Sequence, residues 1–507
     1  MTMFDLIHRR ARLSPERLAV EDLADGTRYT YRELNEQAAR LAAAAYQRWG
    51  LAQGDRLAYL GHSRAEFFAL WFGCAKAGLI LIPLNWRLAV PELDVVLNDA
   101  MPAAMIHGEE FTETATLLAA RRPGLRRISL EPDDGARHYA TDLADSDPDL
   151  GPHPPRSADS PWYLLYTSGT TGRPKGVIQT FRMMEANYGN IGLATGLTRD
   201  DVLLNVLPMF HTAGINLYSS SLFWVGGTVL VQRQFNAAAA LRVLATRATV
   251  FFGVPAVYQA MAEHPDFDHT VLDGVRSWGC GGAVLPLPVA ARYTERGIRV
   301  RCGMGMTETG PTVFLMDEES VLAKPASVGR PQLLTEVRVV DGEGRDVPVG
   351  EAGELWIRGP NMTPGYWQRP DATRDAFAEG GWLRSGDIVR CDADGDYTMV
   401  DRAKDMFISG AENVYPAEVE AVLQTHPAIA EVAVIGVSDA RWGEVGHACL
   451  VAGPDVAAPS DDELRDFCRR ALAGYKVPRH FTWYDALPRN ALGKIIKQEL
   501  RDAHRTP

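Results

Sequence analysis

Short apolar strands alternate with helices along the first three hundred residues, and this alternation constrains the fold more than any other feature. Because strands separated by helices are buried on both faces, the pattern predicts α/β layers built on parallel sheets. One helix has both ends marked, since Thr30-Tyr-Arg-Glu33 has capping-box spacing and the apolar stripe after it ends before Gly50. Strands are expected at residues 56–60, 78–84, 104–107, 162–165, 202–207, 228–231, 249–253 and 298–301.

The character of the sequence changes twice in the second half of the chain. Apolar and polar residues alternate at 336–340 and 354–358 around the turn Asp341-Gly-Glu-Gly344, which predicts antiparallel hairpins in a β subdomain over about 328–400. Beyond Asp401-Arg402-Ala403-Lys404-Asp405, the pattern predicts a compact α+β domain. Its expected elements are a helix at 417–424, a strand at 430–437 and a helix at 460–473. The predicted division is therefore 1–402 and 403–507.

Composition narrows the class of protein. A chain of 507 residues suggests two to four folding units, and 46% apolar with 23% charged residues is ordinary for globular domains. The formal charge of −12 opposes extended binding to nucleic acid or to anionic membranes. The six cysteines are scattered without zinc spacing, so we expect no structural zinc and no disulfide framework, and a cytoplasmic location.

Neither the longest apolar stretch nor the N-terminus has the pattern of a membrane or targeting segment. Residues 67–86 are interrupted by Lys76 and Pro83, which favours a buried helix followed by a strand. The first ten residues lack the apolar core of a signal peptide. No integral membrane association is expected.

The most specific motif is the run Tyr166-Thr-Ser-Gly-Thr-Thr-Gly-Arg-Pro-Lys-Gly176, which follows an apolar strand. Its glycines and hydroxyl side chains allow N–H and O–H groups to converge on an anion, while Arg173 and Lys175 supply positive charge. It differs from a P-loop, because Lys175 lies between Pro174 and Gly176 instead of preceding Ser or Thr. A flexible surface turn would explain any four of these residues, whereas the whole run predicts a phosphate-binding loop.

Two further clusters carry polar groups beside glycines. In Cys302-Gly-Met-Gly-Met-Thr-Glu-Thr-Gly310, the glycines permit close approach of a flat ligand, and Glu308 offers a hard oxygen ligand for Mg²⁺. In Trp382-Leu-Arg-Ser-Gly-Asp387, the carboxylate is placed to chelate two ribose hydroxyls. Taken alone, the first cluster is more often a helix cap and the second an Asx-turn.

These clusters, followed by Arg402, Lys404 and the run Pro488-Arg-Asn-Ala-Leu-Gly-Lys494, resemble the adenylate-forming superfamily of acyl-CoA synthetases, stand-alone adenylation enzymes and luciferases. The resemblance covers essentially the whole chain. It implies a large N-terminal region of two stacked αβ subdomains plus a small β-barrel-like subdomain, and a small mobile α+β C-terminal domain. It also implies two half-reactions. A carboxylate attacks the α-phosphate of Mg-ATP to give acyl-AMP and pyrophosphate, and a thiol, usually that of coenzyme A, then displaces AMP.

The resemblance implies a role for each matching residue. The β- and γ-phosphates would be held by Thr167, Ser168, Gly169, Thr170, Thr171, Gly172 and Lys175. Around the nucleotide, it implies Thr307 at the α-phosphate, Glu308 at Mg²⁺, Asp387 and Arg402 at the ribose, and Gly282, Ala283, Gly303, Met304 and Gly305 in the binding surface. It implies that Lys494 bridges the substrate carboxylate and the α-phosphate, that His211 closes the carboxylate pocket, that Lys404 is the hinge, and that Ser409, Gly410 and Ala411 line the pantetheine tunnel.

The chain departs from the family pattern at two positions. Met304 stands where an aromatic residue usually stacks on adenine, and its thioether can cover the ring with less defined geometry. Cys280 stands where Ser is common, and we interpret it as pocket wall, not as a reactive thiol. No Asp occurs between Met209 and Ser221, which disfavours an amino-acid substrate.

The leading hypothesis is an AMP-forming acyl-CoA synthetase that uses ATP, Mg²⁺ and coenzyme A. The stretches expected to form the acyl pocket contain no Lys or Arg, with Arg276 and Arg301 just outside them, which favours an uncharged acid. Hydroxycinnamate-like aryl acids and medium-chain fatty acids both fit, and the chain is expected to be a monomer or homodimer. The alternatives are an enzyme that loads an acyl carrier protein and a non-catalytic nucleotide-binding protein. The latter would lack Lys175, Glu308 or Lys494, and all three are present.

Overall fold

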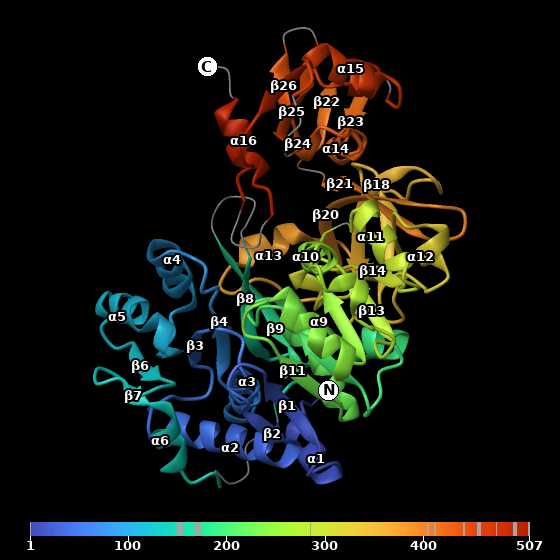
Figure 1. Ribbon diagram of the computed structural model, residues 1–507. Coiled ribbons are helices and arrows are strands. Elements are labelled where there is room, and N and C mark those ends of the chain that lie inside the picture. The colour runs from blue at the N-terminus through green and yellow to red at the C-terminus, as the bar shows by residue number, and fades with distance from the viewer. Residues whose placement is uncertain are drawn as a thin grey trace. The chain divides into compact units, whose positions relative to one another are not determined.

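The computed structural model divides into two compact units. Unit 1 comprises Met1–Val337 and Ile357–Leu383, and unit 2 comprises Arg338–Trp356 and Arg384–Pro507 (Figure 1). The predicted hinge at Lys404 lies outside the described residues, and the division into 1–402 and 403–507 stays a prediction. The structure describes residues 2–149, 156–167, 174–283, 285–402, 405–409, 412–439, 442–453, 458–472, 474–489 and 494–504.

The first sheet of unit 1 has seven strands in the order β7-β6-β5-β3-β4-β8-β9. All neighbours are parallel except β8 and β9, which form an antiparallel hairpin. The strands expected at 56–60, 78–84, 104–107 and 162–165 are confirmed within this sheet. The bounds are β3 (Arg56–Leu60), β4 (Ile80–Pro83), β5 (Ala104–His107), β6 (Arg126–Ser129), β7 (Arg137–His138), β8 (Pro161–Thr167) and β9 (Lys175–Thr180).

The second sheet of unit 1 follows the order β16-β15-β14-β13-β12-β10-β11-β1-β2. It is parallel from β14 to β1, and antiparallel strands extend it at both ends. The four remaining strands expected from the sequence of this region are confirmed here. The bounds are β1 (Leu18–Asp22), β2 (Arg28–Thr30), β10 (Val202–Asn205), β11 (Thr228–Val231), β12 (Val250–Gly253), β13 (Ser277–Cys280), β14 (Val300–Met304), β15 (Phe314–Leu315) and β16 (Ser327–Pro331).

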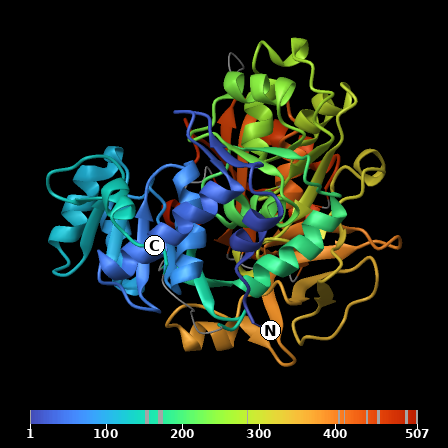
Figure 2. The ribbon, with the colours of Figure 1, turned by 90° about the horizontal axis from the view of Figure 1, so that it is seen from below.

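Alternate residues of the strands enter different cores, as period-two geometry requires. Leu57 and Tyr59 of β3 join the core that also holds Val229 of β11, whereas Ala58 and Leu60 face a separate core. The shared core contains α1 (Leu6–Leu13), α2 (Tyr31–Gln47) and α3 (Ala65–Ala77), so these helices lie between the two sheets (Figure 1, Figure 2). The outer faces are covered by α4 (Val90–Ala100) and α5 (Thr112–Ala120) on the first sheet, and by α9 (Ala237–Thr246), α10 (Pro255–Ala262) and α11 (Leu287–Thr294) on the second.

Two local predictions for the helices are confirmed. The Thr30 hydroxyl accepts from the Glu33 N–H at 3.2 Å while the Thr30 N–H donates to the Glu33 carboxylate at 2.8 Å, which completes the capping box of α2. The apolar stretch 67–86 forms α3 and then β4, as expected. Among the described residues, no helix is both long and apolar enough to cross a membrane.

Shorter helices and turns complete unit 1. They are α6 (Tyr139–Ala144), α7 (Phe181–Asn187), α8 (Ser221–Val225), α12 (Ser320–Ala323), α13 (Pro370–Ala376), the π-helical segments η2 (Tyr188–Gly192) and η3 (Ala213–Ser220), the 3₁₀ turns η1 (Glu109–Phe111), η4 (Phe267–His269) and η5 (Thr307–Thr309), and the short strand β19 (Phe377–Ala378).

Unit 2 contains the larger part of each of four neighbouring strands, and it also contains a separate C-terminal sheet. The four are β17 (Glu336–Val340), β18 (Ala352–Arg358), β20 (Trp382–Cys391) and β21 (Tyr397–Arg402), which confirms the strands expected in the β-rich region. The C-terminal sheet runs β23-β22-β25-β24, with β26 parallel to β25. Its elements are β22 (Phe407–Ser409), β23 (Glu412–Val414), α14 (Pro416–Leu423), β24 (Ile429–Asp439), β25 (Gly443–Ala452), α15 (Asp461–Arg469), η6 (Gly474–Lys476), β26 (His480–Trp483) and α16 (Lys497–Ala503).

The C-terminal sheet is buried on both faces. Val434 and Leu450 join the core of α14 and α15, whereas Ile435 and Cys449 join the core of α16. This alternation explains why the predicted strand at 430–437 is almost continuously apolar. The predicted helices at 417–424 and 460–473 correspond to α14 and α15, and residue 473 lies outside the described residues.

Candidate active site

The predicted phosphate loop connects the two strands of the β8–β9 hairpin. Thr167 and Lys175 are directly opposed at the loop end of this hairpin, and Tyr166 and Gly176 form the next pair. The loop therefore begins at the carboxyl end of β8, a strand that runs parallel to β4. Ser168, Gly169, Thr170, Thr171 and Gly172 lie outside the described residues, and their role stays a prediction.

Tyr366 lies between two of the predicted site residues. The Lys175 Nζ atom is 5.0 Å from the centroid of the Tyr366 ring, and the Tyr366 hydroxyl donates to Glu308 Oε1 at 3.0 Å. Burial and the Glu308 carboxylate raise the pKa of Tyr366, so its hydroxyl keeps its proton and acts as a donor. The fold thus joins Lys175 and Glu308 through one aromatic side chain.

Buried amide groups fix the turn that carries Thr307 and Glu308. Gln179 Nε2 of β9 donates to the Thr307 carbonyl at 2.9 Å, and Asn361 Nδ2 donates to the Thr309 carbonyl at 3.0 Å. The Thr363 N–H donates to the Glu308 carbonyl at 2.8 Å. These bonds hold η5 by its backbone, so the side chains of Thr307 and Glu308 are not needed to anchor it.

A helix cap was the common alternative role for Thr307 and Glu308, but Thr309 forms the cap of this turn. The Met306 N–H donates to Thr309 Oγ1 at 3.0 Å. The Glu308 carboxylate instead accepts from Tyr366, and Glu308 is only 8% exposed. A buried carboxylate that accepts a hydrogen bond from a tyrosine is typical of a functional site, because burying its charge is costly without such a partner.

The glycines of the second cluster are required by the protein's own backbone. A Cβ atom at Gly303 would lie 2.8 Å from the Phe314 carbonyl oxygen, and one at Gly305 would lie 1.3 Å from the Pro311 carbonyl oxygen. β14 and β15 pair there, with Met304 opposite Phe314. The close approach that the sequence suggested for a ligand is therefore made by neighbouring strands, and the contact of these residues with a nucleotide stays a prediction.

The segment after β13 forms an aromatic-lined wall. A Cβ atom at Gly279 would lie 2.7 Å from the Phe252 ring and 2.8 Å from the Tyr218 hydroxyl oxygen. Gly282 has a positive φ of 84°, and both Gly282 and Ala283 are exposed beyond the strand. The glycine at 279 lets the Phe252 ring and the Tyr218 hydroxyl pack directly against β13, and the role of this segment as a pocket wall stays a prediction.

Cys280 faces Cys302 across the β13–β14 pair. Its hydrogen bond with Cys302, together with burial, raises the pKa of the Cys280 thiol. A buried protonated thiol is a poor nucleophile, which agrees with the interpretation of Cys280 as pocket wall.

His211 lies between β10 and η3. Its Nε2 atom is buried and has no hydrogen-bond partner among the described residues. Burial, aided by the positive charge of Arg87, lowers the pKa of His211 to about 4, so the ring is neutral at physiological pH. An unpaired ring nitrogen in an apolar setting is available to a polar group of a bound molecule.

The remaining predicted site residues belong to unit 2. Asp387 of β20 lies opposite Arg402 in the antiparallel register of β20 and β21. Asp387 is buried, and its N–H donates to Ser385 Oγ at 3.1 Å. Ser409 of β22 is buried, and Lys494 is exposed three residues before α16. Lys404, Gly410 and Ala411 lie outside the described residues.

The sequence analysis missed Tyr366, Gln179 and Asn361. Tyr366 follows Gly365 after β18 in a stretch without charge, and Gln179 belongs to a strand whose pattern indicated only burial. Their importance comes from long-range contacts with η5, which no local pattern contains. The one available signal was the polar Gln179 directly after the apolar pair Val177 and Ile178.

Two α/β sheets, a hairpin loop of phosphate-binding composition and a buried carboxylate are features typical of enzymes that bind a nucleotide. Comparison with family models agrees: the AMP-binding enzyme model matches residues 7–367, and the AMP-binding enzyme C-terminal domain model matches residues 418–494. The chain belongs to the AMP-binding enzyme family.

The chain is similar to characterised ligases over its full length. It is 42% identical over 494 residues to a feruloyl-CoA synthase of an Amycolatopsis species, covering 97% of each chain. It is 35% identical over 502 residues to a long-chain-fatty-acid–CoA ligase of Mycobacterium tuberculosis, covering 98% of each. The solved structure of o-succinylbenzoate CoA synthetase from Bacillus subtilis, in complex with its acyl-adenylate, matches with a TM-score of 0.89, 30% identity and 100% coverage of both chains.

The family and these relatives establish the reaction class. The protein is an acid–thiol ligase that forms AMP, and it uses ATP, Mg²⁺ and coenzyme A. The predicted family, fold class, enzyme class and cofactors are thereby confirmed. The non-catalytic alternative is not supported.

Gly305→Ala should destabilise unit 1 by about 3 kcal/mol, because the added Cβ overlaps backbone that cannot move independently. Gly274→Ala is the matched control, since a Cβ there meets nothing within 4 Å. Urea denaturation followed by tryptophan fluorescence measures both variants. Equal midpoints for the two would contradict the backbone contact at Gly305.

The buried neutral state of His211 predicts a pH dependence of stability. With a pKa of about 4 when folded and about 6.5 when unfolded, His211 binds more protons in the unfolded chain between these values. Its contribution is therefore complete above pH 6.5 and is lost as pH falls towards 4, by up to about 3 kcal/mol. His211→Asn should flatten this part of the unfolding free-energy profile, measured by denaturation at stepped pH. Parallel profiles for variant and wild type would disprove the assignment.

Proposed function

We propose that this ligase activates an uncharged carboxylic acid, with a hydroxycinnamate-type aryl acid as the favoured substrate, and transfers the acyl group from acyl-AMP to coenzyme A. The observation that carries the adenylation chemistry is the contact of Lys175 and Glu308 through Tyr366. The 42% identity to a feruloyl-CoA synthase supports the aryl acid. A medium-chain fatty acid is the second candidate, supported by the 35% identity to a fatty-acid ligase.

In this proposal, the residues of unit 1 bind and orient Mg-ATP as a substrate. The Glu308 carboxylate is a hard oxygen ligand suited to the Mg²⁺ that ATP carries, and the Tyr366 hydroxyl orients it. Lys175 lies over the Tyr366 ring at the start of β9 and reaches the phosphates from there. Negative charge grows on the phosphate oxygens as the acid carboxylate attacks, and preorganised positive charge stabilises it.

The remaining roles extend the same proposal. We infer that the loop residues 167–172 bind the β- and γ-phosphates and that Thr307 binds the α-phosphate. Asp387 and Arg402, paired in one hairpin, are proposed to hold the ribose, and Lys494 to bridge the carboxylate and the α-phosphate. His211, with its unpaired neutral nitrogen, would close the carboxylate pocket. Lys404 is proposed as the hinge, and Ser409 with its two neighbours as part of the pantetheine tunnel.

The two arginines just outside the stretches expected to form the acyl pocket are already bound to other groups of the protein. Arg276 contacts the Asp201 carboxylate at 2.5 Å and donates to the Thr195 carbonyl at 3.0 Å. Arg301 donates to the Met316 carbonyl at 2.7 Å and is buried. Neither is available to a second substrate carboxylate, which supports an uncharged acid.

The proposal is tested by a matrix of acids and acceptors. Ferulate, octanoate, malonate and an amino acid are each incubated with Mg-ATP, and release of pyrophosphate and AMP is measured with coenzyme A or with an acyl carrier protein. We expect the highest kcat/KM for ferulate with coenzyme A and no turnover of malonate. Preference for octanoate would shift the substrate to the fatty-acid candidate, and preference for the carrier protein would favour the carrier-loading enzyme. Formation of ADP would contradict adenylation.

Lys494→Ala should separate the two half-reactions. Removing one preorganised positive charge should slow adenylation about 10²–10³-fold, whereas transfer of supplied acyl-AMP to coenzyme A should stay near the wild-type rate. Lys497→Ala is the matched control, because the Lys497 ammonium binds the Glu420 carboxylate at 2.8 Å. Equal losses in both half-reactions, measured separately, would refute the proposed role of Lys494.

A further inference from the structure

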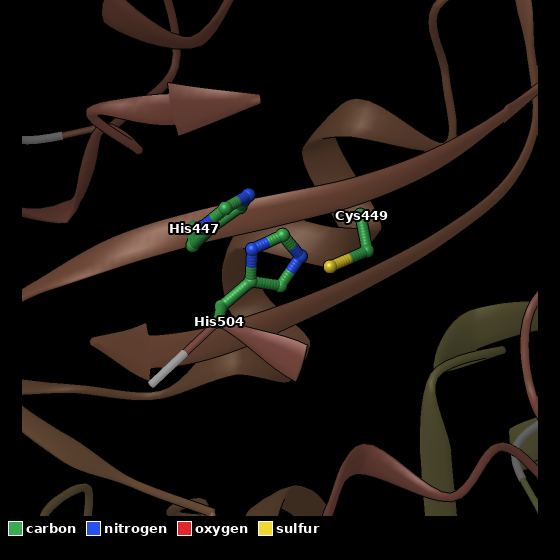
Figure 3. Close-up of side chains that lie close together, drawn as sticks. All are labelled: His447, Cys449 and His504. Carbon is green, nitrogen blue, oxygen red and sulfur yellow. The ribbon is translucent and has the colours of Figure 1, made fainter. Parts of the chain in front are cut away.

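Two histidines and a cysteine meet on one face of the C-terminal sheet in unit 2. His447 and Cys449 are alternate residues of β25 and so share a face, while His504 follows the last residue of α16. One ligand atom from each of the three lies within 4.8 Å of the others. Figure 3 shows the Cys449 sulfur directed towards the His504 ring, with His447 beside it. The adenylation chemistry proposed above uses none of these side chains.

This cluster is buried by the packing of α16 on the C-terminal sheet. Cys449 is fully buried in the same apolar core as Leu500 of α16, and His447 is only 7% exposed. The ring centroids of His447 and His504 are 3.9 Å apart. The polar atoms therefore converge inside a protein core, where ligands are shielded from competing water.

Each imidazole has a hydroxyl partner on the neighbouring strand or loop. His447 Nε2 is 2.8 Å from Thr482 Oγ1, and Thr482 lies opposite Cys449 in the β25–β26 pairing. His504 Nε2 is 2.6 Å from the Tyr484 hydroxyl oxygen. Hydrogen bonds of this kind orient the rings of metal-binding histidines.

We propose that His447, Cys449 and His504 form a binding site for a divalent cation of the zinc type, with water as the fourth ligand. Nitrogen and sulfur ligands select zinc over magnesium or calcium, which prefer oxygen. Ligand atoms around tetrahedral zinc lie about 3.5 Å apart, so the side chains close by about 1 Å on binding. The Cys449 Sγ–H bond breaks, its proton passes to solvent and an Sγ–metal bond forms, without a change of oxidation state.

Metal binding at this site would tie the end of α16 to β25. Lys494 lies three residues before α16, so the same tie would restrain the segment that carries the proposed adenylation lysine. The cation would thus make this segment of unit 2 more ordered, and this effect is separate from the role of the Mg²⁺ that accompanies ATP.

The test uses the full-length chain without an affinity tag, reduced and freed of metal by a chelator. Zinc chloride titrated in a calorimeter should bind at one equivalent per chain and release about one proton. Cobalt chloride should give a thiolate-to-cobalt charge-transfer absorption in the near ultraviolet. Zinc should also slow amide hydrogen exchange over residues 497–503.

Variants locate the site. Cys449→Ser should abolish the cobalt absorption and weaken zinc binding roughly 100-fold or more, because loss of a ligand costs at least as much as loss of the partner that orients it. His504→Ala, at the chain end, should weaken binding similarly and decides the question if Cys449→Ser fails to fold. Cys468→Ser is the matched control, since Cys468 is a buried cysteine in the core on the opposite face of the same sheet.

Three results would overturn the proposal. They are the absence of binding to wild type at micromolar zinc, wild-type affinity in both Cys449→Ser and His504→Ala, and an equal loss of binding in Cys468→Ser. The last result would indicate that any buried thiol of this domain affects binding indirectly.

Discussion

The burial of α3 between the two sheets of unit 1 is the constraint on which the rest of that unit depends. Residues 67–75 of this helix are all apolar and buried, so the helix is stable only where other elements cover it on every side. Trp71 of α3 stacks on Trp162 of β8 with ring centroids 4.3 Å apart, and the Trp162 indole N–H donates to the Trp71 carbonyl at 2.8 Å. The start of β8 is thereby fixed to the core, and the strand delivers Thr167 and the phosphate loop at its other end.

The second half of the site is positioned by buried amides instead of apolar packing. Gln179, Asn216 and Asn361 each donate to backbone carbonyls of residues 307–312, with Asn216 Nδ2 reaching the Gly310 carbonyl at 2.9 Å. A buried amide without such a partner is costly, so each of these bonds strongly specifies one backbone position. The turn bearing Thr307 and Glu308 is consequently held in place by bonds to its backbone.

The elements of the fold were predictable wherever their signal is local. The capping box at Thr30 and the apolar runs of the strands follow from a few adjacent residues, and the structure confirms them. Tyr366 was not predictable, because its importance comes from Lys175 and Glu308, which are distant in sequence. The cluster of His447, Cys449 and His504 was not predicted for a related reason. Zinc spacing is recognised when ligands are close along the chain, whereas here β25 and the end of α16 supply them.

The same distinction between local and long-range signals applies to the proposed substrate class. The absence of Lys and Arg from the pocket stretches is local, but the state of the nearby Arg276 is not. Burial opposes the ionisation of Asp201, yet hydrogen bonds from Arg276, the Thr198 backbone and Thr249 keep the pKa of this carboxyl below its usual value. Arg276 therefore stabilises a buried charge that the fold needs.

Acceptance of a dicarboxylic acid would consequently require more than a reoriented arginine. Moving Arg276 towards the pocket would leave Asp201 buried without its main partner, at a cost greater than a substrate contact returns. The stretches expected to form the pocket contain no Lys or Arg that could replace it. The proposed preference for an uncharged acid thus depends in part on how the second sheet is held together.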